Sequence, residues 1–194
     1  FSDLIDPLVV SHSVEKIFKL DTHMGATAAG ILSDARVLIE RSQVQAQQHR
    51  VSYDTPVEVL SIVKTVCDLK QICTQSGGLR PFGVSLLIMG VDKKGPCLYE
   101  TDPTGIFFQY HAAVIGEGET EIEELLQKQY SPDMTIEQGI KLAITGLKKA
   151  VNDHFNSERI DCAFITAADK TFTRLPRAKI EKIAKEVKVD VKKE

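Results

Sequence analysis

The chain has 194 residues, of which 43% are hydrophobic and 26% are charged, and its formal net charge is −3. This balance disfavours a nucleic-acid-binding domain, which normally carries a basic stripe. It also lacks the run of about 18 uncharged apolar residues that a membrane-spanning helix needs. Residues 1–12 carry acidic side chains where a secretory signal has basic ones. We therefore predict a cytoplasmic globular protein with one domain over residues 1–194.

The first half of the chain predicts two short strands and two helices. Residues 15–20 and 24–29 have strand composition around a turn at 21–23. Gly30 marks the start of a helix over 32–49, whose inward positions are Leu32, Ala35, Leu38, Ile39, Ser42 and Ala46. Thr55, Pro56 and Glu58 have the spacing of a capping box, so the second helix is expected to begin there and to end at Ser76-Gly77-Gly78.

The middle of the chain predicts an antiparallel meander with strands near 82–92, 97–101 and 105–115. Val84 to Val91 is apolar at successive positions, so both faces of this strand should be covered. Antiparallel sheets usually leave one face wet. A meander that is apolar on both faces therefore indicates a buried middle layer between other layers.

The second half predicts two more helices, two strands and a closing helix. Thr120 with Glu123, and Thr135 with Gln138, have capping-box spacing. The longer of these helices should bury Ile136, Ile140, Ala143, Ile144, Leu147 and Val151. Strands follow near 160–166 and 170–173, and Ile180, Ile183 and Val187 mark the inner face of the last helix. The order of elements predicts an α+β, four-layer αββα sandwich.

No motif in the sequence demands a metal, a cofactor or a catalytic group. The four cysteines form no C-x-x-C and the five histidines form no H-E-x-x-H, so we expect reduced thiols and no metal site. The acidic residues from Glu117 to Glu124 surround a predicted helix start, where negative charge is favourable. A nucleophile elbow of the form G-x-S-x-G is absent.

Four segments carry a resemblance to one family. They are Ser13 to Ile17, Ser33 to Ile39, Arg80 to Leu87 (RPFGVSLL) and Leu98 to Gly105 (LYETDPTG). In order and spacing they resemble the alpha-type subunit of the proteasome core particle, the archaeal type in particular, across about residues 13 to 188. The family has the αββα fold that N-terminal-nucleophile hydrolases share, in agreement with the sandwich that the element order predicts.

The resemblance implies a non-catalytic subunit of a protein-degrading particle. Alpha subunits of this family form a seven-membered ring that stacks on rings of beta subunits, gates the passage of unfolded protein substrates and docks activators such as a regulatory ATPase. Proteolysis in that particle belongs to the beta subunits, whose nucleophile is an N-terminal threonine. This chain begins with Phe1 instead. We therefore expect no catalytic residue of its own.

The resemblance also assigns roles to particular residues. Gly30 and Ile31 match the remnant of an activator-docking pocket in which leucine is usual at the second position. Ser76, Gly77 and Gly78 match a Tyr-Gly-Gly turn that lines the channel annulus, so serine would widen that constriction. The family-signature scaffold comprises Arg80, Pro81, Phe82, Gly83, Asp102 and Gly105.

Family members carry a tail, a helix and two strands before the position of Ser2. We therefore expect this chain to be truncated at its N-terminal side, with an incomplete sandwich that exposes apolar sheet faces. Two alternatives stay open. One is a hydrolase of the N-terminal-nucleophile type with its own catalytic site. The other is an interaction domain without a role in assembly.

Overall fold

The computed structural model describes residues 15–151 and 155–187, which form two compact units. The sheet unit comprises residues 18–116 and 165–173, and the helical unit holds the remaining described residues. None of the described helices is both long and apolar enough to cross a membrane.

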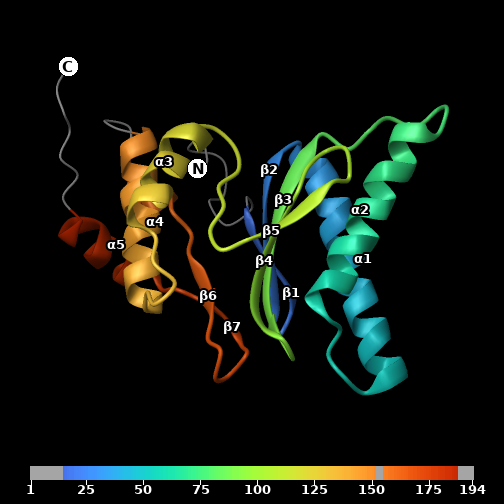
Figure 1. The fold of residues 1–194 in the computed structure, drawn as a ribbon, viewed down its shortest axis with the longest axis horizontal. Coiled ribbons are helices and arrows are strands. Elements are labelled where there is room, and N and C mark those ends of the chain that lie inside the picture. The colour runs from blue at the N-terminus through green and yellow to red at the C-terminus, as the bar shows by residue number, and fades with distance from the viewer. Residues whose placement is uncertain (1–14, 152–154, 188–194) are drawn as a thin grey trace, which may run out of the picture. The chain divides into compact units, whose positions relative to one another are not determined.

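The sheet unit contains a five-stranded sheet and two helices (Figure 1). The strands lie in the order β1 (Ile17–Asp21), β2 (Met24–Gly30), β3 (Val84–Asp92), β4 (Gly95–Thr101) and β5 (Phe107–Tyr110). β3 pairs antiparallel with β2 and β4, and β4 pairs antiparallel with β5. The helices α1 (Leu32–Tyr53) and α2 (Val59–Gln75) lie against one face of this sheet. The strands and helices predicted for the first half and for the meander are thus confirmed in type and order. Their bounds differ in places, since α1 extends to Tyr53 and β5 is shorter than predicted.

The core of the sheet unit lies between the sheet and the two helices. Leu86 and Ile88 of β3 are fully buried on this face, together with Leu38 of α1 and Ile62 of α2. α2 comes so close to the sheet that a Cβ placed on Gly90 would lie 2.5 Å from Cγ2 of Val59. On the opposite face of β3, Leu87 and Met89 are half-buried. One of the two predicted apolar faces of β3 is therefore closed by helices.

The helical unit is built around three helices, α3 (Glu119–Gln129), α4 (Ile136–Val151) and α5 (Arg177–Glu186). A short 3₁₀ turn, η3 (Ser157–Arg159), precedes β6 (Ala163–Ile165). β6 pairs with β7 (Phe172–Arg174) in a separate two-stranded sheet, of which residues 165–173 belong to the sheet unit. The core of this unit gathers Ile144, Ile160, Ile180 and Ala184. The mixed α+β class is confirmed, because these helices and sheets alternate as the sequence predicts.

One of the three predicted capping boxes is confirmed. Before α4, the backbone N–H of Thr135 donates to Oε1 of Gln138 at 2.8 Å, and the N–H of Gln138 donates to Oγ1 of Thr135 at 3.3 Å. This reciprocal pair satisfies two donors that the helix start would otherwise leave without partners.

The other two capping boxes are wrong. α2 begins only at Val59, and no side chain caps it. Val57 is the reason, because its side chain is buried and its carbonyl contacts Nε2 of His23 at 2.9 Å, which keeps this stretch out of the helix. α3 begins at Glu119 after Gly118, whose positive φ of 75° and carbonyl start the first turn. Packing and backbone conformation thus override the local motif at both places.

The predicted inner face of α4 is partly wrong. Ala143 is exposed and Ile136 is 43% exposed, whereas Leu142 and Gly146 are buried. A Cβ on Gly146 would lie 2.8 Å from Ile122 of α3, so α3 covers a second row of α4 residues. A similar correction holds for Leu32 in α1, which is 42% exposed because it sits in the first turn of the helix.

Two glycine substitutions test this packing. We expect Gly90→Ala to destabilise the fold by about 1–3 kcal/mol, since the new methyl group meets Val59 and the carbonyl of His23. Gly139→Ala is the matched control: nothing lies within 4 Å of its Cβ, and a helical glycine replaced by alanine gains roughly 0.5–1 kcal/mol. Urea unfolding measures both changes, and equal effects of the two substitutions would contradict the packing.

Candidate functional site

Three chain connections meet at one end of the sheet unit, which we call the junction end. They are the connection from β2 to α1, the loop from α2 to β3, and the turn between β4 and β5. The backbone N–H of Ile31 donates to the carbonyl of Gly83 at 2.9 Å, which joins the first connection to the second. Most of the residues that the sequence singled out lie in these three connections.

An ion pair ties the α2–β3 loop to the start of α1. Nη1 and Nη2 of Arg80 donate to the two carboxylate oxygens of Asp34 at 2.7 and 2.6 Å. The backbone N–H of Gly83 donates to the same carboxylate at 2.9 Å. The hydrogen bonds from Arg80 and then from Gly83 hold the pKa of Asp34 below its ordinary value, although burial opposes them. The Arg80 to Gly83 signature is therefore anchored through one nearly buried carboxylate.

The turn between β4 and β5 is organised by the side chain of Asp102. Its Oδ1 accepts hydrogen bonds from the backbone N–H groups of Thr104 and Ile106 at 2.8 and 3.0 Å. Burial alone would raise the pKa of Asp102, yet the hydrogen bonds from Thr104, Ile106 and Gly105 hold it below its ordinary value. Gly105 has a φ of 94°, and a Cβ there would lie 2.6 Å from the carbonyl oxygen of Cys67 in α2. Glycine is thus required for the turn to lie against α2.

A buried lysine lies between these connections. The side chain of Lys70 in α2 is fully buried, and its Nζ donates to the carbonyl of Val84 at 2.9 Å, to Oγ1 of Thr101 at 2.9 Å and to the carbonyl of Asp102 at 3.0 Å. Burial lowers the pKa of this ammonium to about 8. Lys70 thus connects α2 to the first residue of β3 and to the β4–β5 turn.

The Ser76-Gly77-Gly78 turn projects from the junction end. It follows the last residue of α2, and the loop that continues it toward β3 extends beyond the body of the sheet unit (Figure 1). A Cβ placed on Gly77 or on Gly78 meets no other atom within 4 Å, and Gly78 has a φ of 89°. Within the turn, the N–H of Leu79 donates to the carbonyl of Ser76 at 3.2 Å. The tip is therefore open, while its flanks are fixed.

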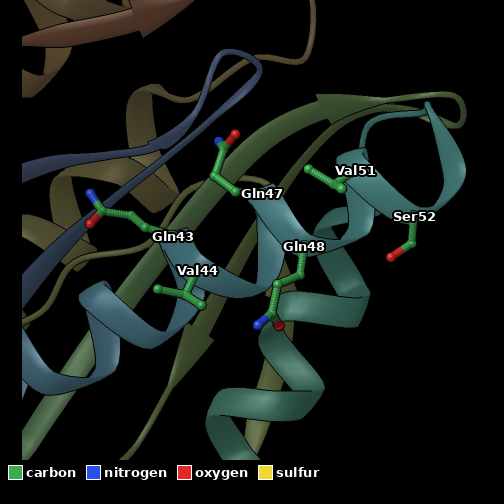
Figure 2. A pocket seen from close by; sticks show the side chains of 6 residues that line it. All are labelled: Gln43, Val44, Gln47, Gln48, Val51 and Ser52. Atoms are coloured by element: carbon green, nitrogen blue, oxygen red, sulfur yellow. The ribbon is translucent and has the colours of Figure 1, made fainter.

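The outer face of α1 carries an exposed apolar row. Val37, Val44 and Val51 follow one another at intervals of seven residues and are 42%, 55% and 87% exposed. Figure 2 shows Val44 and Val51 among the side chains of Gln43, Gln47, Gln48 and Ser52, which together line a shallow hollow of about 440 Å³. We call the three valines and these polar neighbours the outer face of α1. It has no charged residue among the six side chains that line the hollow.

A second hollow, of about 620 Å³, lies at the opposite end of the sheet unit, beside the β1–β2 turn. Its charged lining residues balance, with Arg50, Lys93 and Lys170 facing Glu58, Asp92 and Asp169. Nη2 of Arg50 pairs with Asp21 at 3.0 Å, so that guanidinium is already engaged. Nothing in this hollow singles out a ligand.

Metal chemistry finds no support within residues 15–151 and 155–187, where no three histidine, cysteine, aspartate or glutamate side chains could together hold an ion. The hydrolase alternative stays a hypothesis, because residues 1–14 lie outside the part of the chain that the structure describes.

Comparison with known proteins decides the family. Residues 4–165 match the proteasome subunit family. The chain is 44% identical over 180 residues to a proteasome subunit alpha of Methanocaldococcus jannaschii, which covers 93% of this chain and 69% of that protein. It is 46% identical over 193 residues to the proteasome subunit alpha of Pyrococcus horikoshii, covering 100% of this chain and 72% of the relative. A Methanopyrus kandleri proteasome subunit alpha is 43% identical over 187 residues, or 96% and 73% of the two chains.

The chain belongs to the proteasome subunit family and is of the archaeal alpha type.

The resemblance read from the sequence is thus confirmed, and the junction end of this proteasome subunit contains all of its predicted site residues. Gly30 and Ile31 contact Gly83 through their backbones, and Arg80 shares a carboxylate with that glycine. Asp102 and Gly105 lie against α2 in the neighbouring turn. The Ser76 to Gly78 turn stands apart from these contacts. The roles that the family assigns to these residues remain predictions.

Sequence reasoning missed Asp34 and Lys70. Lys70 lies four residues after Val66 and therefore on the inward stripe of α2 that begins with Val59 and Ile62. A lysine on a buried stripe is unusual, because a buried ammonium is costly without partners. That position was the signal that could have identified it. Asp34 gave no comparable signal, since an acidic residue in a first helical turn is common.

The lowered pKa of Lys70 predicts how stability depends on pH. The ordinary value is 10.5, so between pH 8 and 10.5 the unfolded chain binds more protons than the folded one, and stability due to this group rises with pH. We expect the free energy of unfolding of wild type, relative to Lys70→Met, to increase across this window by about 1.4 kcal/mol for each pKa unit of the shift. Urea unfolding at several pH values measures it. Both proteins are compared in a Cys67→Ala background, because the charge of Lys70 lowers the pKa of Cys67 and the thiol would otherwise titrate differently in the two. A difference that stays constant with pH would contradict the prediction.

Proposed function

We propose that this chain is a non-catalytic ring subunit of the proteasome core particle. It shapes the opening through which unfolded proteins pass, and beta subunits cleave them. The proposal is supported by the Ser76 to Gly78 turn, because a Cβ placed on either of its glycines meets open space while both flanks of the turn are anchored. A projecting turn on a fixed base suits the rim of a channel, because its position is set although nothing covers it.

The fold supports membership in a layered assembly. Two helices close one face of the five-stranded sheet, and apolar side chains such as Leu87 and Met89 stay half-buried on the other. We infer that a second sheet covers this face in the complete four-layer sandwich. The particle's location would be the cytoplasm.

We assign the activator-docking role to Gly30 and Ile31. Ile31 is 46% exposed, so an activator's C-terminal segment could reach it. The hydrogen bond from the N–H of Ile31 to the carbonyl of Gly83 fixes the backbone there, and the positive φ of 117° at Gly30 favours glycine at that position. The partner expected at this place is a regulatory ATPase or another activator.

We assign a subunit contact to the outer face of α1. Three exposed valines at a seven-residue spacing suit a second helix that crosses α1 at a shallow angle, since this spacing keeps the apolar row on one side. The surrounding side chains of the hollow are uncharged, so they can be buried at low cost. The partners that the family supplies are neighbouring alpha subunits and the beta subunits.

Co-expression with a beta-type partner tests the function. We expect native mass spectrometry to show a stacked-ring particle that hydrolyses peptides, and we expect the chain purified without beta subunits to hydrolyse none. Failure to assemble would contradict the proposal. Peptide hydrolysis by the isolated chain, with covalent labelling by an electrophilic inhibitor, would favour the hydrolase alternative.

The turn at the rim predicts a change in selectivity. In the assembled particle, Ser76→Tyr should slow the degradation of an unfolded protein and leave hydrolysis of a short peptide unchanged. The reason is that the bulky tyrosine side chain narrows the opening. Thr74→Tyr, at an exposed position of α2 outside the turn, is the control. Equal rates for wild type and Ser76→Tyr on the unfolded protein would show that the turn does not line the opening.

The outer face of α1 predicts an assembly defect. Val44→Glu should reduce the yield of assembled particle, since it places a charge in an apolar contact. Gln48→Glu introduces the same charge on the same face without removing an apolar side chain and should assemble better. Native mass spectrometry after co-expression compares the two yields, and full assembly of Val44→Glu would exclude this face as a contact.

A further inference from the structure

The ammonium of Lys70 is buried without a carboxylate partner. Within the part of the chain that the structure describes, no carboxylate lies within ion-pair distance of its Nζ, and its acceptors are backbone carbonyls and the hydroxyl of Thr101. The nearest acidic side chain in the turn, that of Asp102, accepts hydrogen bonds from Thr104 and Ile106 instead. Moving an ammonium out of water is costly, and hydrogen bonds to all three of its protons can compensate this cost. Lys70 makes such hydrogen bonds to Val84, Thr101 and Asp102.

The acceptors of Lys70 belong to elements on both sides of the α2–β3 loop. Lys70 lies in α2, ahead of the loop, and the carbonyl of Val84 is the first of β3, after it. This bond therefore closes a ring of chain that contains the Ser76 to Gly78 turn. The other acceptors, at Thr101 and Asp102, fix the same nitrogen to the end of β4.

The far side of the loop has a second anchor. Arg80 and the N–H of Gly83 both donate to the carboxylate of Asp34 in α1. Between the two anchors, the tip at Gly77 and Gly78 has open space around it. We therefore expect the position of the tip to depend on the flanks, because a Cβ placed on either of the two glycines meets no atom within 4 Å.

We propose that Lys70 is the positioning residue of the Ser76 to Gly78 turn. Its ammonium, rather than its aliphatic stem, fixes α2, β3 and the β4–β5 turn to one point and so sets where the turn projects. That this turn bounds a channel rests on the proposed function; that Lys70 fixes the turn does not.

The alternative is that Lys70 only fills space in the core with its aliphatic stem, in which case its charge would have no effect on the loop. Methionine has a similar unbranched stem, so Lys70→Met would fill the same space and leave the loop unchanged. If the charge matters, Lys70→Met removes the donors of three bonds and frees the loop while α1 keeps its packing. The exposed Lys64→Met, on the same helix, is the matched control.

Hydrogen exchange of the purified full chain at pH 7 distinguishes the two roles. We expect amide exchange over residues 76–83, reported by the N–H groups of Leu79 and Gly83, to become about tenfold faster in Lys70→Met. The reason is that the free energy of local opening falls by the contribution of one charged hydrogen bond. Exchange over residues 38–46 of α1 should stay at the wild-type rate. Wild-type exchange of residues 76–83 in Lys70→Met would overturn the proposal.

A milder variant decides the matter if Lys70→Met unfolds as a whole. Thr101→Val removes one acceptor and leaves the lysine in place, so faster exchange confined to residues 76–83 supports the proposal, and unchanged exchange there overturns it.

Lys70→Ala with added propylammonium adds a test of the charge. Slowed exchange with propylammonium but not with 1-propanol supports a role of the ammonium, and equal effects of the two overturn it.

The assembled particle gives the functional readout. With beta subunits, Lys70→Met should raise the ratio of unfolded-protein degradation to short-peptide hydrolysis, because a loosened turn no longer limits passage, whereas Lys64→Met should keep the wild-type ratio. A wild-type particle that fails to assemble would count against the proposed function. An assembled Lys70→Met particle with the wild-type ratio, together with wild-type exchange, would count against Lys70 alone.

Discussion

The structure of the junction end depends on a single constraint: a positive charge enclosed by protein must find enough oxygen atoms. Lys70 finds them in Val84, Thr101 and Asp102, which belong to the start of one strand and the end of another. Its burial lowers its pKa to about 8, which shows the cost of keeping the group away from water. Because the acceptors come from separate segments, satisfying one ammonium also fixes the relative positions of those segments.

The family signature can be understood from this arrangement. Arg80 reaches the carboxylate of Asp34, Gly83 leaves room for Ile31, and Gly105 lets a turn lie against α2. Each of these residues makes a hydrogen bond or allows a close packing contact at the same end of the sheet. These contacts together anchor both flanks of the loop that carries Ser76.

Much of the fold could be predicted from sequence, since the strands and helices follow the period of apolar residues. The antiparallel meander, the start of α1 and the capping box at Thr135 are examples. The starts of α2 and α3 could not be predicted, because the buried Val57 and the backbone of Gly118 override the capping motifs. The site was only partly predictable: turn residues carry recognisable motifs, whereas the partners of Lys70 lie 14 to 32 residues away and meet only in the folded protein.

Electron microscopy of the particle formed with beta subunits would locate the Ser76 to Gly78 turn in the assembly. We expect a ring of alpha subunits in which the copies of this turn surround the central channel. A ring in which the turn faces the outer surface, or in which contacts between subunits cover the turn completely, would show that the turn does not bound the channel.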